Sequence, residues 1–159
     1  MNRTWLVLDC NYLCHRAKHS MGSLSYGGNA TGVVYGFLKD IITLKKRFET
    51  NYIVFCWDYG KGIRKLISSD YKSNRHKDKE DDDFEISFKK QVTLLRTEYL
   101  KQIGFRNIFY QDGYESDDII ASVCRNLPDG DKGIIVSADH DLYQLLTANI
   151  SMYNPQKKI

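Results

Sequence analysis

Short apolar runs alternate along this chain with longer segments whose apolar residues recur at helical spacing, and this alternation constrains the fold more than any other feature. The short runs are typical of buried strands, and the longer segments are typical of amphipathic helices. Strands that alternate with helices predict an α/β domain with a central, mostly parallel sheet flanked by helices. The five expected strands are Trp5–Leu8, Tyr52–Trp57, Asn107–Tyr110, Gly133–Ser137 and Ile150–Tyr153.

Three apolar stripes predict the faces by which the main helices pack on the sheet. We expect their residues to form core rather than a functional site. The stripes are Val33, Val34, Phe37, Leu38, Ile41, Ile42 and Phe48, then Phe88, Val92, Leu95, Tyr99 and Ile103, and finally Ile119, Ile120, Val123, Cys124 and Leu127.

Length and composition narrow the class of protein. The 159 residues, 42% of them hydrophobic, suffice for one domain with a sizeable core. The apolar runs are far shorter than the roughly 20 residues that cross a bilayer, and the N-terminus does not resemble a signal peptide. The four cysteines do not complete a zinc site, so we expect buried free thiols. The expected protein is therefore soluble, cytoplasmic and without a membrane partner.

The segment from Asp58 to Asp83 lacks apolar periodicity and is rich in charge. Loops of this length are usually functional or disordered. Residues 61–79 carry a net charge of +5 in a chain whose total is only +3, so the remainder is net acidic. Basic residues neutralise phosphates, and Tyr71 offers a face on which a base could stack. The alternative is a charged loop anchored by one aromatic side chain. The candidate nucleic-acid contacts in this loop are Lys61, Arg64, Lys65, Tyr71, Lys72 and Arg75.

Seven acidic residues follow the predicted strands or open the helix after the third strand. In a parallel sheet the carboxyl ends of the strands meet at one edge, so we expect these carboxylates to converge. Each of them alone could simply be a helix cap. Together they repel one another, and either raised pKa values or bound cations must relieve the repulsion. The seven are Asp9, Asp58, Glu115, Asp117, Asp118, Asp139 and Asp141.

Oxygen ligands without an accompanying set of Cys or His favour Mg²⁺ or Mn²⁺ over zinc. One or two such ions could support cleavage of a phosphodiester bond. His140 lies between Asp139 and Asp141, but strand alternation would point it away from them, so we do not expect it to be a ligand.

Four blocks of residues, in this order, resemble the nuclease domain of the 5'-3' exonuclease and flap endonuclease family, which includes the 5' nuclease part of bacterial DNA polymerase I. Residues 31–38 look like that family's first helix. The resemblance spans nearly the whole chain and implies a three-layer PIN-like, resolvase-like fold with a helical arch or clamp near residues 60–85. The blocks are residues 8–11, 55–58, 71–75, and 115–118 with 137–141.

The resemblance also implies roles for individual residues. The seven carboxylates correspond to the family's metal cluster, with Asp141 toward the second metal position. Lys72 and Arg75 match basic residues that face the scissile phosphate, Tyr71 matches a neighbouring aromatic residue, and Arg16 matches another phosphate contact. On this basis the catalytic set would be Asp9, Asp117, Lys72 and Arg75.

Members of the family usually continue into a helix-three-turn-helix module, whereas this sequence stops at Ile159. We expect that module to be absent here. Either the chain is truncated, or it is naturally short and a separate partner chain supplies the module. Apart from such a partner, we expect the protein to be a monomer. The expected function is Mg²⁺-dependent hydrolysis of DNA that has a free 5' end or 5' flap, leaving 5' phosphates. The alternatives are a PIN-type ribonuclease, a flap-binding module with an incomplete second metal site, and a phosphotransferase with Asp9 as nucleophile, which Asn11 disfavours.

Overall fold

The computed structural model describes residues 2–60 and 82–159. In these ranges strands and helices alternate as the sequence predicts, although several elements are shorter or additional. The elements in chain order are β1 (Thr4–Asp9), α1 (Cys10–Met21), β2 (Ser25–Tyr26), β3 (Asn29–Ala30), α2 (Gly32–Phe48), β4 (Tyr52–Cys56), α4 (Asp82–Leu94), the π-helical turn η1 (Leu95–Tyr99), α5 (Leu100–Ile103), β5 (Ile108–Phe109), α6 (Ser116–Arg125), β6 (Lys132–Val136), the 3₁₀ helix η2 (His140–Leu145) and β7 (Ile150–Tyr153).

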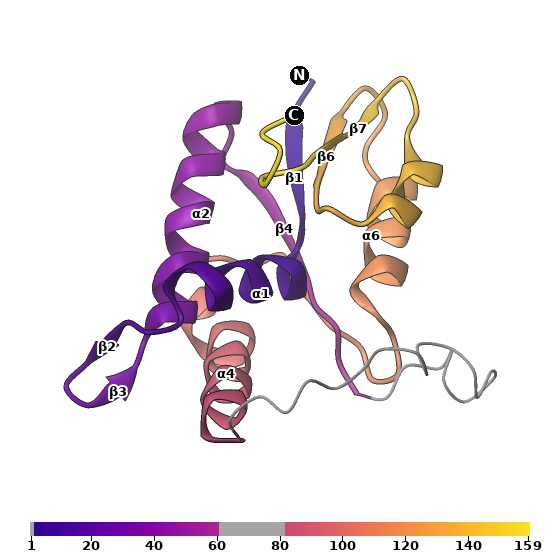
Figure 1. Cartoon of the computed structure of the whole chain (residues 1–159). Coiled ribbons are helices and arrows are strands. Elements are labelled where there is room, and N and C mark those ends of the chain that lie inside the picture. The colour runs from indigo at the N-terminus through magenta and orange to yellow at the C-terminus, as the bar shows by residue number, and fades with distance from the viewer. Residues whose placement is uncertain (1, 61–81) are drawn as a thin grey trace.

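Five strands form one sheet in the order β5-β4-β1-β6-β7, and every neighbouring pair is parallel (Figure 1). The predicted parallel sheet is therefore confirmed. In the central pairing, Asp9 at the end of β1 lies opposite Cys56 at the end of β4. The strands β1, β4 and β6 consequently deliver the residues that follow them to the same edge of the sheet.

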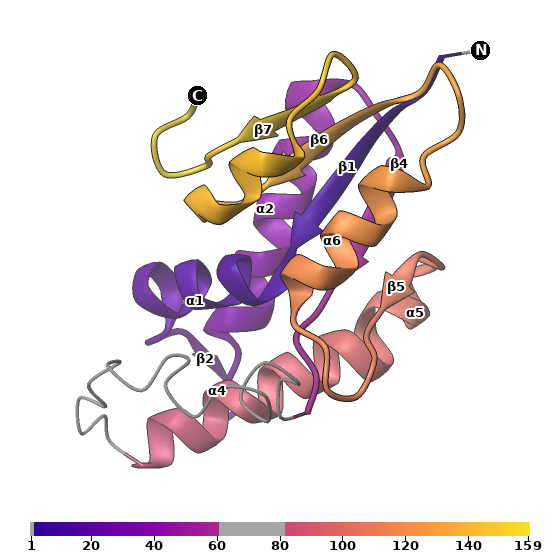
Figure 2. The ribbon, with the colours of Figure 1, turned by 90° about the vertical axis from the view of Figure 1, so that its right-hand side faces the viewer.

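Helices cover both faces of the sheet, which gives three layers (Figures 1 and 2). On one face α1, α2 and α4 pack around fully buried side chains such as Phe37, Phe55 and Trp57. On the other face α6 and η2 cover Val7, Ile120 and a smaller set of apolar residues. No helix in residues 2–60 and 82–159 is long and apolar enough to cross a membrane.

Two residues of the predicted apolar stripes are not core residues. Ile103 is 55% exposed, because the π-helical turn η1 shifts the phase of the helix, and Leu100 takes the buried position instead. Ile42 is 56% exposed, because α2 turns its inward face through Phe37, Ile41 and Leu44, and Ile42 lies about 100° around the helix from Ile41.

Other boundaries also differ from the sequence prediction. The charged segment, predicted to lack a regular pattern up to Asp83, meets α4, which begins at Asp82. The helical arch or clamp expected near residues 60–85 lies mostly outside the residues that the structure describes. Residues 31–38, which were expected to belong to the first helix, form the start of the second helix, α2, because α1 precedes it in the chain. The hairpin of β2 and β3 was not predicted. Its two turn residues, Gly27 and Gly28, both have positive φ, which favours glycine.

Three of the four cysteines are buried, as predicted: Cys10, Cys14 and Cys56. The fourth, Cys124, is only partly buried, and all four are free thiols. Burial raises the pKa of these three thiols well above its usual range, which keeps them protonated and unreactive.

Candidate metal and nuclease site

Asp9 lies where β1 passes into α1 and is only 6% exposed. Its Oδ1 accepts a hydrogen bond from the Tyr12 backbone N–H at 3.2 Å, which makes Asp9 the N-cap of α1. Two hydroxyl groups hold the same carboxylate: Ser137 Oγ donates to Oδ2 at 2.7 Å, and Ser116 Oγ donates to Oδ1 at 3.2 Å. The carboxylate is thus fixed by three different parts of the chain.

Burial is the main cause that raises the pKa of Asp9, to about 6, and the charge of Asp58 adds to it. The hydrogen bonds from Ser137, Tyr12 and Ser116 oppose the shift but do not cancel it. Burial therefore makes the Asp9 carboxylate harder to ionise than an exposed Asp, although three donors contact it.

Asp58 follows β4 and faces the N-terminus of α6. Its Oδ1 accepts a hydrogen bond from the Ser116 backbone N–H at 2.6 Å, and its own backbone N–H donates to Asn11 Oδ1 at 2.9 Å. These bonds join the ends of β1 and β4 to the start of α6.

The N-terminus of α6 carries Glu115, Asp117 and Asp118. Glu115 and Asp118 form a capping box, in which the Asp118 carboxylate accepts the Glu115 N–H at 3.3 Å. Their prediction as helix-opening acids is confirmed. Asp117 has its pKa raised to about 6, first by burial and then by the charges of Asp9, Asp139, Asp58 and Glu115. Five carboxylates thus interact around one point, and we call Asp9, Asp58, Glu115, Asp117 and Asp139 the carboxylate cluster.

Asp139 and Asp141 belong to the start of η2. Asp139 caps this helix, because its Oδ1 accepts the Asp141 backbone N–H at 2.9 Å. Asp141 is exposed, and it is not among the strongest influences on the pKa of Asp117. It nevertheless lines a cavity of about 330 Å³ that has Asp117 and Asp118 on its other side. Asp118 and Asp141 are therefore brought together next to the cluster rather than in it.

The cluster suits a hard divalent cation, since all its members are carboxylates and four of them raise the pKa of the fifth, Asp117, by their charge. A carboxylate has about four lone-pair sites, so the three hydrogen bonds to Asp9 leave it able to contact an ion as well. Within residues 2–60 and 82–159, however, no three His, Cys, Asp or Glu side chains are already arranged as a metal site. Some of these carboxylates would have to turn in order to coordinate an ion.

Of the seven residues predicted to contact DNA, the structure describes one, Arg16. Arg16 on α1 forms an ion pair with Asp40, Nη1 to Oδ2 at 2.5 Å, with a third of its side chain exposed. Its contact with phosphate remains a prediction. The other six lie outside the residues that the structure describes: Lys61, Arg64, Lys65, Tyr71, Lys72 and Arg75.

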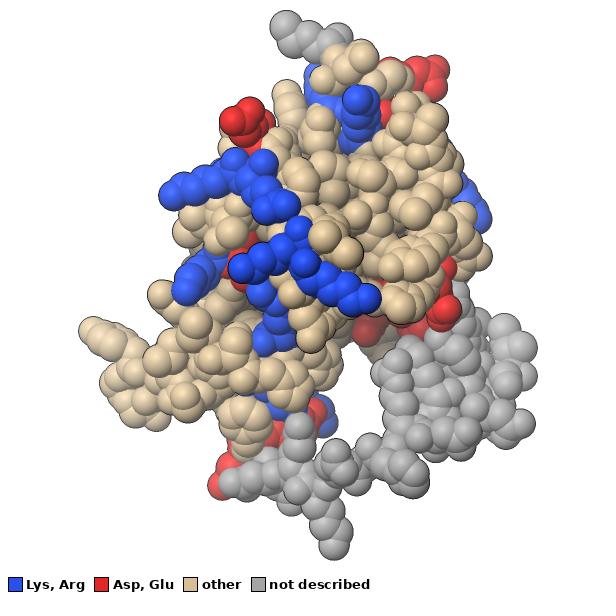
Figure 3. Space-filling model, turned by 45° about the horizontal axis from the view of Figure 1, so that its top comes forward, with Lys and Arg blue, Asp and Glu red and all other residues tan. Residues whose placement is uncertain are grey.

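In the view of Figure 3, most Lys and Arg side chains gather left of the centre, and one group of acidic side chains lies to their right, while other acidic side chains are scattered over the same face. His140, which the sequence did not favour as a ligand, stacks on Tyr143 with ring centroids 5.0 Å apart.

The functional residues that sequence reasoning missed hold the carboxylates in place. Ser116 and Ser137 donate to Asp9, and Asn11 fixes the backbone of Asp58. In the sequence, each of them is only a hydroxyl or amide residue near an acid that follows a strand. That pattern is too common to predict such a role. Arg96, whose Nη1 donates to the Asp58 carbonyl at 3.3 Å, gave no signal, since it lies 38 positions away in a helix.

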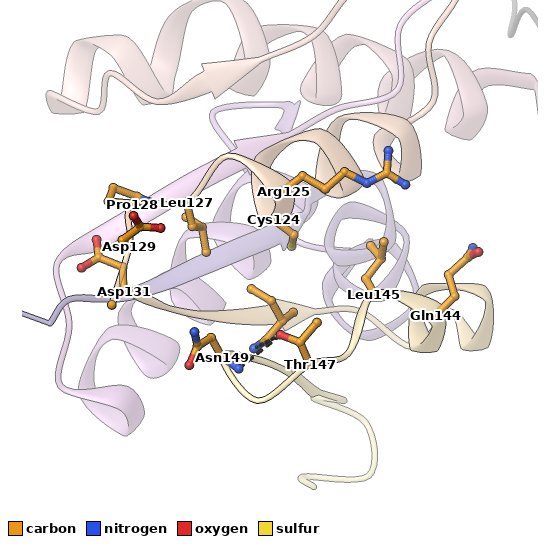
Figure 4. A pocket seen from close by; sticks show the side chains of 12 residues that line it. Cys124, Arg125, Leu127, Pro128, Asp129, Asp131, Gln144, Leu145, Thr147 and Asn149 are labelled. Carbon is orange, nitrogen blue, oxygen red and sulfur yellow. Dashed lines mark hydrogen bonds between the residues drawn. The ribbon is translucent and has the colours of Figure 1, made fainter.

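A second cavity of about 330 Å³ lies between α6 and the turn before β7 (Figure 4). Its lining includes Cys124, Arg125, Leu145 and Asn149 but none of the seven predicted carboxylates. This cavity is therefore separate from the carboxylate cluster.

Comparison with known proteins identifies the family. The family model of the 5'-3' exonuclease N-terminal resolvase-like domain matches residues 4–159. The chain is 33% identical to a 5'-3' exonuclease of Bacillus subtilis (strain 168) over 164 residues, which cover 99% of the chain and 53% of that protein. It is 29% identical to the thermostable DNA polymerase I of Thermus aquaticus over 95% of the chain and 17% of the polymerase. The chain spans about half the length of the curated exonucleases that it matches.

Solved structures share the fold. A bacteriophage T5 protein co-crystallised with metal ions superposes with a TM-score of 0.77 at 20% identity, over 99% of this chain and 57% of that one. A bacteriophage T5 flap endonuclease crystallised with DNA and metal ions gives a TM-score of 0.73 at 20% identity, with the same coverage. The predicted resolvase-like, PIN-like fold is thereby confirmed, and the chain belongs to the family of 5'-3' exonuclease N-terminal resolvase-like domains.

Proposed function

We propose that this chain is the catalytic domain of a Mg²⁺- or Mn²⁺-dependent nuclease that hydrolyses phosphodiester bonds in DNA with a free 5' end or 5' flap and leaves 5' phosphates. The observation that carries the proposal is the position of Asp117, half-buried among four other carboxylates at the edge where β1, β4 and β6 end. A similarly folded flap endonuclease has been crystallised with DNA and metal ions, which supports the choice of substrate and cofactor.

In this proposal the carboxylate cluster holds the first cation, and Asp118 and Asp141 contribute to a second position. A bound divalent cation would supply Lewis-acid stabilisation of charge on the phosphate. The residues of the chain supply the orientation: Ser116 and Ser137 keep the Asp9 carboxylate directed at the cluster, and the Ser116 N–H does the same for Asp58. Lys72 and Arg75 would contact the scissile phosphate.

A second candidate is a flap-binding module that requires further protein for full activity. It is favoured by the arrangement around Asp141, which is exposed and shares its cavity with Arg125 and, among the described residues, with two other acids, Asp117 and Asp118. A second metal position with so few carboxylates is incomplete unless another segment or chain adds ligands.

Cleavage of a labelled 5'-flap DNA in Mg²⁺ tests the proposal. We expect the wild-type chain to release the flap, and matched RNA flaps to be cut more slowly. Asp117→Asn should lower the rate by more than about 100-fold, beyond the 10–100-fold that loss of a residue supporting a metal ligand costs. Asp129→Asn is the matched control, because Asp129 is exposed in the turn before β6 and should leave the rate unchanged.

Full cleavage by the Asp117→Asn variant would contradict the proposal. Binding of the flap without cleavage in either Mg²⁺ or Mn²⁺ would also contradict it and would support the binding module instead.

A further inference from the structure

Asp58 is held on three sides, one for each polar part of the residue. Its N–H donates to Asn11 of α1, its carboxylate accepts from the Ser116 N–H of α6, and its carbonyl accepts from Arg96 Nη1 at 3.3 Å. Buried backbone groups are normally paired with other backbone groups, side chains or water. Here the partner of the Asp58 carbonyl is the guanidinium of Arg96, a half-buried residue 38 positions further along the chain, and this choice of partner calls for an explanation.

The Arg96 side chain lies between two aromatic rings. Its guanidinium carbon is 4.8 Å from the ring centroid of Tyr59 and 5.4 Å from that of Tyr110, and the two rings are 5.3 Å apart. Stacking of this kind fixes the plane of the guanidinium and so the direction of its donors. Arg96 itself is carried by the π-helical turn η1, a type of irregularity that often occurs at functional sites.

One donor of Arg96, its Nε, is buried and has no hydrogen-bond partner among the residues that the structure describes. A buried donor without a partner lowers stability, so within this part of the chain the position of Arg96 is not explained by stability alone. Violations of this kind are expected where a residue serves a site.

The backbone beyond Asp58 is bound to the turn that leads into α6. The Tyr59 N–H donates to the Tyr114 carbonyl at 3.3 Å, and the Gly113 N–H donates to the Tyr59 carbonyl at 3.1 Å. Gly60 has φ of +72°, and a side chain there would collide with the Asp112 carboxylate. The segment 58–60 is thus fixed to residues 112–116 on one side, and Arg96 fixes it on the other.

We infer that Arg96 is a positioning residue for the cation site: by holding the carbonyl of Asp58 and the ring of Tyr59, it sets the direction in which the Asp58 carboxylate enters the carboxylate cluster. The inference rests on the proposed function, because it takes Asp58 to be a cation ligand. Arg96 itself does not touch the cation or the substrate in this account.

Three variants test the inference. Arg96→Met keeps an apolar stem but removes the donor and the charge, and Arg96→Lys keeps the charge but loses the planar fork that bonds and stacks. Arg106→Met is the control, since Arg106 is exposed and ten positions further along. Two quantities are measured below the unfolding temperature: hydrogen exchange of the Ser116 amide, which is bonded to Asp58, and Mn²⁺ affinity from the electron paramagnetic resonance signal of free Mn²⁺.

We expect both Arg96 variants to speed exchange at Ser116 more than at the later amides of α6 and to weaken Mn²⁺ binding about tenfold, while Arg106→Met changes neither. A purely structural role would raise exchange evenly along α6 and leave Mn²⁺ affinity within about twofold of wild type, and that result would overturn the inference. Should Arg96→Met not fold, Arg96→Lys and Tyr110→Leu decide by the same two readouts. Wild-type protein that binds no Mn²⁺ would contradict the proposed function, whereas unchanged exchange at Ser116 would contradict the positioning role of Arg96.

Discussion

The Asp9 carboxylate has two structural roles. As the N-cap of α1 it accepts a backbone N–H from Tyr12, and as a member of the carboxylate cluster it lies next to other acids at 6% exposure. The first role favours the ionised form, and the second disfavours it, because burial and the charge of Asp58 outweigh three hydrogen bonds. A capping residue that served only its helix would have no reason to be buried among like charges.

This conflict predicts how stability depends on pH in the absence of metal. The pKa of Asp9 is raised from 3.8 to about 6 on folding, so the folded state binds this proton more tightly than the unfolded state does. The contribution of Asp9 to the free energy of unfolding is therefore fully present below pH 4 and is lost as the pH rises through 6. We expect a loss on the order of 2–3 kcal/mol from Asp9, and Asp117 acts in the same direction, but less strongly because solvent screens it.

Urea unfolding in a chelator at pH 4 to 8 measures this effect, with Asp9→Asn as the comparison because Asn does not titrate. The wild-type unfolding free energy should fall with rising pH relative to that of Asp9→Asn, while Asp129→Asn should follow the wild type. Parallel curves for wild type and Asp9→Asn would show that burial of Asp9 does not raise its pKa.

At the scale of elements, α2 is held at its N-terminus by a residue of another helix. Its N-cap Thr31 makes no side-chain cap bond, and Gln91 of α4 supplies the missing acceptor: Oε1 accepts from the N–H groups of Val33 at 3.0 Å and Val34 at 3.2 Å. Gln91 is 6% exposed, so water cannot readily replace it. This contact ties α4, which follows the charged segment, to the helix that packs against α1.

We predict that Gln91→Leu destabilises the protein by about 2 kcal/mol, because it leaves two N–H groups without an acceptor. Gln91→Glu should retain most of the stability, since it keeps an acceptor oxygen and suits the helix dipole. Lys90→Ala, at an exposed neighbouring position, is the control. Urea unfolding of the three variants measures the difference, and equal midpoints for Gln91→Leu and Lys90→Ala would contradict the capping role.

What could be predicted from the sequence were features with a regular local pattern. The strand β1 and the acid-bearing N-terminus of α6 follow from apolar runs and capping preferences, and the parallel sheet then brings Asp9 and Asp117 together. Features that depend on a phase shift or on a distant partner could not be predicted. Neither the π-helical turn that exposes Ile103 nor the hydrogen bond from Arg96 to Asp58 appears as a periodic pattern in the sequence.

At the scale of the whole molecule, the all-parallel sheet determines where the chemistry lies. Because β1, β4 and β6 run in one direction, the residues after them meet at one edge, and α6 points its acid-bearing N-terminus at the same place. In the resulting cluster the pKa values of Asp9 and Asp117 are raised, first by burial and then by the charges of neighbouring carboxylates. The central claim is that divalent cations neutralise this cluster.

The most direct test is the anomalous scattering of Mn²⁺ in crystals of the chain soaked in MnCl₂. We predict a peak at coordination distance from the carboxylates of Asp117 and at least two other members of the cluster, with any second peak toward Asp118 and Asp141. Asp117→Asn crystals should lose the first peak, while Asp129→Asn crystals should keep it. Wild-type crystals with an accessible cluster and no anomalous peak beside Asp117 would contradict the account.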